Sequence, residues 1–175
     1  LLTNTDYMFE TEDIYTSTLI IDDSIISFTY ATKLNPKDFE TYNNLGRAYL
    51  VIGKLNEAEK AFFRSTSIKN DYFPAQYNLA MTYGKLGKFI EAEEVYKIAI
   101  RLNPNHAQSY YNLGNIFVKL NKPYRAEKAY KKAIEIKPDY SMCFNNLGVI
   151  YWGLGKFKES EKNYKMAITK DSNNI

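Results

Sequence analysis

The chain has 175 residues, of which 45% are hydrophobic and 25% are charged, the composition of an ordinary globular protein. It contains no apolar run of about 18 residues, so we expect no membrane-spanning helix. The net charge of +3 combines six acids and one base in residues 1–36 with a net surplus of bases in residues 37–175. This charge asymmetry is mild, whereas nucleic-acid-binding proteins usually carry a denser basic stripe.

The single cysteine, Cys143, excludes an internal disulfide and suits a reducing compartment. The N-terminus begins Leu1-Leu2-Thr3-Asn4, without an initiating Met and without the pattern of a signal peptide. We therefore expect a fragment of a longer intracellular protein, either cytoplasmic or nuclear.

A short pattern recurs every 34 residues, and one small residue in each copy marks it: Gly46, Ala80, Gly114 and Gly148. An aromatic residue follows three positions later, a Gly or Asn seven positions later, and a second aromatic residue 16 positions later. We expect two helices in each copy, separated by a residue in the left-handed conformation that Gly and Asn tolerate. The small residue lets the two helices approach closely.

The first elements in chain order are an incomplete copy of this pattern. Ser24 and Phe28 stand in register with the second helix of later copies, which predicts a helix near residues 21–34. Upstream, Tyr15 keeps the pattern, but Glu12 occupies the small-residue position. We expect a helix near residues 6–17, with an extended segment as the alternative, because terminal repeats are often atypical.

Helix-ending and helix-starting residues support the remaining elements. Pro104 and Pro138 follow the second helices of two copies, and Asn121 replaces Gly at one of the mid-copy breaks. Pro123 comes just after that break, in the first turn of a helix, where its missing N–H is not needed.

This pattern resembles the tetratricopeptide repeat family over residues 37–172. The resemblance implies an all-α fold, a right-handed superhelical solenoid of antiparallel helix pairs. We divide the chain accordingly into a degenerate N-terminal repeat at 1–36, four repeats at 39–72, 73–106, 107–140 and 141–172, and a tail at 173–175.

The first helix of each repeat has a packing side and a free side. In the first full repeat, Leu45 and Gly46 fall on the packing side, and Asn44 and Arg47 fall opposite. The family resemblance implies that the free sides line a concave groove. The expected peptide- or partner-binding residues are Asn44, Arg47, Tyr77, Asn78, Met81, Tyr111, Asn112, Asn115, Asn146 and Trp152.

Four of these residues form a ladder at intervals of 34: Asn44, Asn78, Asn112 and Asn146. Asn costs a helix about 0.6 kcal/mol relative to Ala, so helix stability does not explain the ladder. Its amide both donates and accepts hydrogen bonds and can hold an extended backbone. The ladder resembles that of the repeat arm of O-GlcNAc transferases, which holds substrate polypeptide. The alternative is that these amides bond to a neighbouring helix.

We expect no catalytic, metal or cofactor site. His106 is the only histidine, and Cys143 lacks a nearby His to activate it, so we expect a structural thiol. The clamp that some family members use for chaperone tails needs Lys before the ladder, where this chain has Asn43, Tyr77, Tyr111 and Asn145. Charged clusters on the second helices are expected to be solvated: Glu91, Glu93, Glu94, Lys128, Lys131 and Lys132.

The sequence therefore predicts a non-catalytic protein–protein interaction module that binds a peptide or partner protein in the groove. A structural scaffold subunit of a multiprotein assembly is one alternative, and the substrate-binding arm of a larger enzyme such as an O-GlcNAc transferase is the other. We expect protein partners and no nucleic acid. No polar capping helix follows the last repeat near Lys170, so end-to-end self-association of the fragment is also expected.

Overall fold

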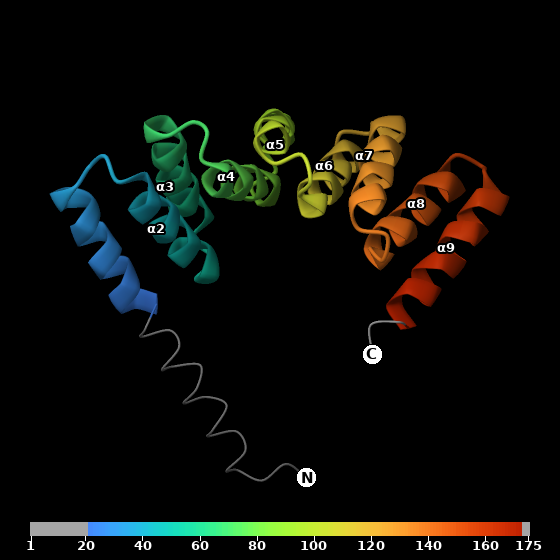
Figure 1. Ribbon diagram of the computed structural model, residues 1–175, viewed down its shortest axis with the longest axis horizontal. Helices are drawn as coiled ribbons and strands as arrows, with labels where there is room; N and C mark the ends of the chain where they lie inside the picture. The colour runs from blue at the N-terminus through green and yellow to red at the C-terminus, as the bar shows by residue number, and fades with distance from the viewer. Residues whose placement is uncertain (1–20, 173–175) are drawn as a thin grey trace, which may run out of the picture. The chain divides into compact units, whose positions relative to one another are not determined.

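The computed structural model describes residues 21–172, and these residues contain helices and turns but no strand (Figure 1). They fall into two compact units, unit 1 (Leu1–Leu86) and unit 2 (Gly87–Ile175). Within this described part, the predicted all-α array of helix pairs is confirmed. The expected element at residues 6–17 lies outside it.

Unit 1 contains a helix over residues 21–34, as the register predicted, followed by α2 (Phe39–Val51), α3 (Leu55–Ile68) and α4 (Phe73–Lys85). α2 packs along α3, and α3 packs along α4. Asp38 caps α2, because its Oδ1 accepts hydrogen bonds from the backbone N–H groups of Glu40 and Thr41 at 3.1 and 3.2 Å. The hydroxyl of Ser65 donates to the carbonyl of Phe39 at 2.7 Å, which ties α3 to the start of α2.

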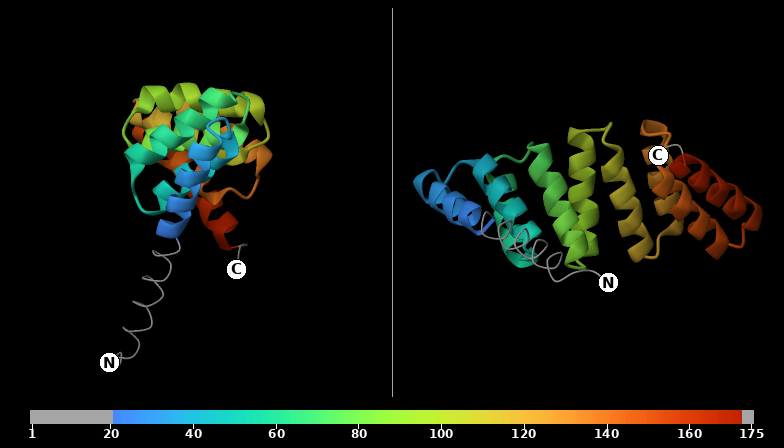
Figure 2. Two further views of the ribbon diagram at one scale, coloured as in Figure 1. Left: turned by 90° about the vertical axis from the view of Figure 1, so that its left-hand side faces the viewer. Right: turned by 90° about the horizontal axis from the view of Figure 1, so that it is seen from below.

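Unit 2 contains α5 (Phe89–Leu102), α6 (Ala107–Lys119), α7 (Pro123–Ile136), α8 (Ser141–Gly153) and α9 (Phe157–Ser172). α6 pairs with α7 and α8 pairs with α9, and consecutive helices lie side by side (Figure 2). Pro123 is the first residue of α7, as predicted.

The breaks between paired helices adopt the predicted left-handed conformation. Gly53, Gly87 and Gly155 have φ of 73°, 76° and 72°, and Asn121 has φ of 55°. Asn121 is the one non-glycine residue with positive φ among residues 21–172. Within the units, the breaks at Gly53, Asn121 and Gly155 let the chain reverse within a few residues, so that α3, α7 and α9 return along α2, α6 and α8.

The close approach of paired helices depends on the glycines of the first helices. An added Cβ would lie 2.7 Å from the Phe62 ring at Gly46, 2.5 Å from the Tyr130 ring at Gly114, and 2.7 Å from the Tyr164 ring at Gly148. In these three repeats an aromatic ring therefore rests directly on a glycine. Any side chain at the glycine would have to displace the ring.

The prediction that the charged clusters are solvated is wrong for Glu93, which is only 7% exposed. Its carboxylate accepts from Lys97 at 2.5 Å, Lys122 at 2.8 Å and Arg125 at 3.3 Å. Burial by itself would raise the pKa of Glu93, but the hydrogen bonds from Lys122 and Lys97 outweigh it, and the pKa is lowered. The carboxylate thus joins α5 to the start of α7, a contact that a 34-residue pattern within single helices does not reveal.

We predict that Gly114→Ala lowers the free energy of unfolding by about 1–3 kcal/mol, the usual cost of overpacking. The Tyr130 ring is buried and its hydroxyl donates to Asn115 at 2.6 Å, so the ring cannot move aside without breaking that bond. Gly153→Ala is the matched control, because a Cβ there meets nothing within 4 Å. Urea denaturation followed by circular dichroism measures both variants, and equal stabilities for the two would contradict the close-approach account.

We predict that Glu93→Gln destabilises the protein at neutral pH by about 1–2 kcal/mol, since partly exposed cations lose one shared carboxylate. Because the folded-state pKa of Glu93 is lowered, its contribution is present above the ordinary pKa of 4.5 and is lost as pH falls below it. The difference in stability between the wild type and Glu93→Gln should therefore disappear at acidic pH. Thermal melts at pH 7 and pH 3 test this, with the exposed Glu94→Gln as control.

Candidate functional site

Unit 1 has a pocket of about 450 Å³ on the free side of its first helices. Four of the predicted binding residues meet there: Asn44 and Arg47 of α2, and Asn78 and Met81 of α4. The helix over residues 21–34 and the last turns of α2 supply apolar side chains to the lining: Ile21, Phe28, Leu50 and Val51. The pocket is therefore an apolar recess with a few polar groups at its edge.

Two of these polar groups are free to bind a ligand. Within residues 21–172, the side chains of Asn44 and Arg47 make no hydrogen bond or ion pair. Asn78 differs, because its Nδ2 donates to the Oδ1 of the buried Asn43 at 3.0 Å. Asn78 thus bonds to the neighbouring first helix, while Asn44 and Arg47 keep their donors available.

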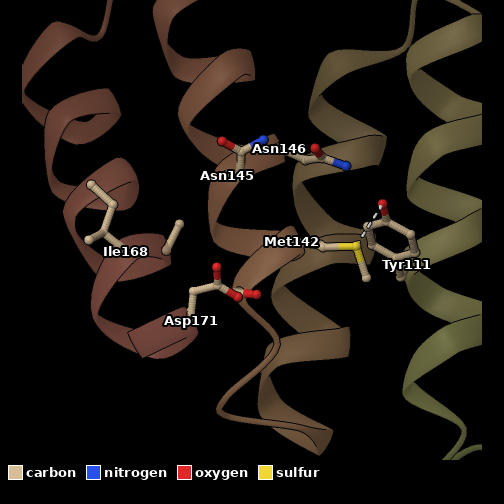
Figure 3. A pocket seen from close by; sticks show the side chains of 8 residues that line it. Tyr111, Met142, Asn145, Asn146, Ile168 and Asp171 are labelled. Atoms are coloured by element: carbon tan, nitrogen blue, oxygen red, sulfur yellow. Dashed lines mark hydrogen bonds between the residues drawn. The ribbon is translucent and has the colours of Figure 1, made fainter. Parts of the chain in front are cut away.

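Unit 2 has a second pocket of about 450 Å³, formed by α6, α8 and α9 (Figure 3). It brings together the predicted residues Tyr111 and Asn146, and it adds the exposed residues Met142 and Asp171. Figure 3 shows Met142 extending toward Tyr111, whose hydroxyl lies 3.8 Å from the Met142 sulfur. The carboxylate of Asp171 gives this pocket an acidic edge, whereas Arg47 gives the pocket of unit 1 a basic edge.

The two remaining ladder residues, Asn112 and Asn146, form hydrogen bonds within unit 2. Asn146 donates from Nδ2 to the Oδ1 of Asn115 at 3.0 Å and to the Oη of Tyr130 at 3.2 Å. Burial raises the pKa of Tyr130, whose hydroxyl in turn donates to Asn115. The Oδ1 of Asn112 accepts from Gln108 at 3.2 Å. At Asn78 and Asn146 the structure thus shows the bonds to a neighbouring helix that the sequence left as an alternative.

Four of the ten predicted residues lie outside the linings of these two pockets: Tyr77, Asn112, Asn115 and Trp152. Tyr77 stacks on Phe73, with ring centroids 6.1 Å apart, and is outside the lining of the unit 1 pocket. Trp152 is 63% exposed and contacts Phe157 edge-on at 5.0 Å, in a separate recess between α8 and α9. The ten predicted residues therefore do not form one continuous site.

The sequence reasoning missed the contribution of the second helices. Ser24 and Phe28 in unit 1, and Ile168 and Asp171 in unit 2, line the pockets beside first-helix residues. Ser24 and Phe28 stand in register with Ala58 and Phe62, which are buried, but both are themselves half-buried. Nothing in the 34-residue pattern distinguishes them from equivalent residues that are covered in other repeats.

The one cysteine and the one histidine of the sequence are both at least partly buried. Cys143 is fully buried, and burial raises the pKa of its thiol to about 12. The Nδ1 of His106 lies 2.9 Å from the Ser109 hydroxyl, and burial lowers the pKa of His106. Among residues 21–172, His, Cys, Asp and Glu form no cluster of three or more that could hold a metal ion. None of the helices described is long and apolar enough to cross a membrane.

Models of the tetratricopeptide repeat match residues 27–60, 73–106, 107–140 and 141–170. No curated protein matches the sequence. Two crystal structures of MamA are similar: one is 26% identical with a TM-score of 0.86, covering 99% of this chain and 98% of that one. The other is 28% identical with a TM-score of 0.84, covering 96% and 91%.

A more distant structure is that of YrrB, described as a TPR protein with an unusual peptide-binding site. It is 21% identical, with a TM-score of 0.73, and covers 83% of this chain and 75% of that one. At this identity the likeness shows the shared fold alone.

We predict that Cys143 does not react with a thiol reagent such as Ellman's reagent at pH 8 in the folded protein. Its pKa of about 12 leaves almost no thiolate, and the sulfur is buried. The same protein in denaturing urea should react fully within minutes. Rapid reaction of the folded chain would contradict a structural role for this thiol.

Proposed function

The chain belongs to the tetratricopeptide repeat family, and we propose that it holds an extended segment of a partner protein in the pocket of unit 1. The family supports a protein-interaction module, and the peptide-binding pocket is our inference from the geometry. The observation that carries it is the pairing of an apolar recess with two polar side chains, Asn44 and Arg47, that have no partner among residues 21–172.

The chemistry of the pocket favours a particular kind of segment. The recess accepts one apolar side chain, and burying such a side chain contributes about 1.5–3 kcal/mol. The Asn44 amide can bond the peptide backbone on either side of it, and the Arg47 guanidinium can bond a carbonyl or carboxylate. We therefore propose a segment with an aliphatic or aromatic anchor and an acidic neighbour, bound in extended form.

Whereas the pocket of unit 1 has a basic edge, the pocket of unit 2 has an acidic edge. Asp171 at its edge attracts a basic or amide-bearing side chain, and Tyr111 and Met142 provide an apolar surface. A partner that occupies either pocket alone is expected to bind weakly, on the order of 10–100 µM, because one anchor offsets little of the entropy of ordering a peptide.

The proposal is non-catalytic. The buried thiol of Cys143 supports this, because a covered thiol is not available as a nucleophile. The scaffold-subunit and transferase-arm alternatives stay predictions. The transferase alternative has less support from the ladder than the sequence suggested, because the amides of Asn78 and Asn146 already bond to neighbouring helices.

A peptide array can test the proposal. The array would carry ten-residue synthetic peptides with one central apolar residue and a systematically varied charge on either side. We predict that the selected peptides carry an acidic neighbour and that Asn44→Ala and Arg47→Ala each weaken their binding about 3–10-fold. Arg47 is exposed and Asn44 has no bond to lose, so neither change should shift the melting temperature by more than a few degrees.

Arg101→Ala is the matched control, because Arg101 is an exposed arginine of unit 2 that lies outside the pocket lining. If Arg101→Ala and Arg47→Ala weakened binding equally, the loss would come from the change in net charge and not from the pocket, and the proposal would be refuted. Asn78 is a poorer probe, because its removal also breaks the bond to Asn43.

A further inference from the structure

Three cationic side chains of unit 2 converge on the carboxylate of Glu93. The Nζ atoms of Lys97 and Lys122 lie 2.5 and 2.8 Å from its oxygens, and the Nη1 of Arg125 lies 3.3 Å away. The Glu93 side chain is only 9% exposed, whereas the three cations are 49%, 38% and 60% exposed. We call Lys97, Lys122 and Arg125 the α5–α7 cation cluster. Its positive charge exceeds the negative charge of Glu93 by two, and this surplus lies on the exposed side.

The cluster also has hydrogen-bond donors to spare. A lysine ammonium carries three N–H donors and an arginine guanidinium carries five. Within residues 21–172, Lys97, Lys122 and Arg125 each donate one hydrogen bond, in every case to Glu93. The guanidinium of Arg125 also lies 5.9 Å from the centre of the Phe117 ring, a contact that uses no N–H donor. Most donors of the cluster are therefore available to an anion.

The next repeat provides an internal comparison. Glu127 stands 34 residues after Glu93 and accepts from Lys131 at 2.6 Å and from the Tyr151 hydroxyl at 2.8 Å. Burial alone would raise the pKa of Glu127, but these hydrogen bonds and the nearby charge of Lys156 lower it. Two lysines and one hydroxyl are thus enough to keep a carboxylate at this position ionised.

The additional cation at the earlier position is Arg125. In the other three repeats the equivalent residue is an acid: Glu57, Glu91 and Glu159. Phe117 stands at the position of Tyr151 and offers no hydroxyl, so Arg125 supplies the third donor to Glu93. A guanidinium in place of a neutral hydroxyl adds a full positive charge. The surplus of positive charge is therefore particular to the junction of α5 and α7.

Two exposed apolar side chains stand close to the cluster in the sequence. Ile90 is 66% exposed and Tyr124 is 63% exposed, and each is the second residue of its helix, α5 and α7. Ile90 precedes Glu93 by one turn, and Tyr124 adjoins Arg125. A ligand that places an anion on the cluster therefore has apolar surface nearby for its flanking groups.

The charge and the exposure of the cluster favour a phosphate group carried by a protein. A phosphate monoester has a charge of about −1.5 to −2 at neutral pH and three acceptor oxygens, and arginine binds it in a bidentate manner. This charge matches the surplus of two, whereas a carboxylate carries only one. Because the cations are partly exposed, water and salt weaken their hold on a small free anion. A segment that also contacts Ile90 and Tyr124 gains apolar burial in addition.

We propose that the α5–α7 cation cluster binds a phosphorylated serine or threonine of a partner protein. The short side chains of these residues keep the flanking residues of the segment close to Ile90 and Tyr124. The cluster shares no residue with the lining of the unit 1 pocket or of the pocket formed by α6, α8 and α9. The proposal therefore does not rest on peptide binding at either pocket.

The direct test is an array of ten-residue peptides with central phosphoserine and systematically varied flanks. Each peptide is also printed with Ser and with Glu at the centre, and the array is probed with the labelled 175-residue chain. We predict a set of phosphoserine peptides that bind at least about tenfold more strongly than their Ser counterparts, with the Glu peptides in between. If no phosphoserine peptide exceeded its Ser counterpart, or if the Glu peptides bound equally well, the proposal would be overturned.

Inorganic phosphate distinguishes a protein-borne phosphate from a small ligand. We predict that it competes with a selected phosphopeptide only at millimolar concentrations, because the free ion makes no contact with Ile90 or Tyr124. Competition by micromolar inorganic phosphate would assign the cluster to a small anion and overturn the proposal.

Matched arginine variants locate the contact. We predict from fluorescence anisotropy that Arg125→Gln weakens binding of a selected phosphopeptide about tenfold or more. Arg64→Gln removes the same charge from an exposed arginine of α3 and should leave binding unchanged. Arg47→Ala should leave it unchanged as well, so failure of the unit 1 pocket and failure of this cluster give different results. Equal losses for Arg125→Gln and Arg64→Gln would assign binding to net charge and contradict the proposal.

Glu93→Gln distinguishes an anion site from a cluster that only joins α5 to α7. The change removes the competing negative charge and keeps all three cations, so phosphopeptide binding should strengthen several-fold although the variant is less stable. Glu94→Gln, at an exposed position of the same helix, changes the net charge equally and should have a smaller effect. Weaker binding to Glu93→Gln, or equal effects of the two changes, would show that the cluster has a structural role alone.

Discussion

In three of the helix pairs a glycine in the first helix lies against an aromatic ring in the second, and much of the packing of these pairs depends on this contact. The three pairs that show it are Gly46 with Phe62, Gly114 with Tyr130, and Gly148 with Tyr164. Because the ring occupies the space of the absent side chain, the helix axes come close and the first helix can pack in one rotation only. That rotation turns the residues two positions before the glycine toward the free side.

This packing determines which side chains lie on the free sides of the first helices. In unit 1 they leave Asn44 and Arg47 beside an apolar recess, and in unit 2 they leave Tyr111 and Met142 beside Asp171. Within unit 2 the packing also links one repeat to the next, since the Tyr151 hydroxyl of α8 donates to Glu127 of α7. One repeated arrangement of helix pairs thus underlies the proposed peptide pockets.

Much of the fold was predictable because backbone constraints are local. A left-handed break at Asn121 and a helix start at Pro123 follow from single residues, and both were predicted. The candidate site was less predictable, because its residues act across repeats. Whether Asn78 faces a peptide or Asn43 depends on a contact 35 residues away, and the burial of Glu93 depends on cations from α7. A periodic pattern identifies equivalent positions, but it does not show which of them find partners.

Side-chain amide signals in the NMR spectrum of the isotope-labelled chain test the central claim most directly. The claim is that a partner segment binds at the free side of α2 and α4 through Asn44 and Arg47. On titration with an array-selected peptide, we predict that the Asn44 amide and the Arg47 guanidinium signals shift most. The signals of Asn56 and Asn163, on the second helices α3 and α9, should stay in place. Shifts confined to the second helices, or shifts spread evenly over all asparagines, would contradict the claim.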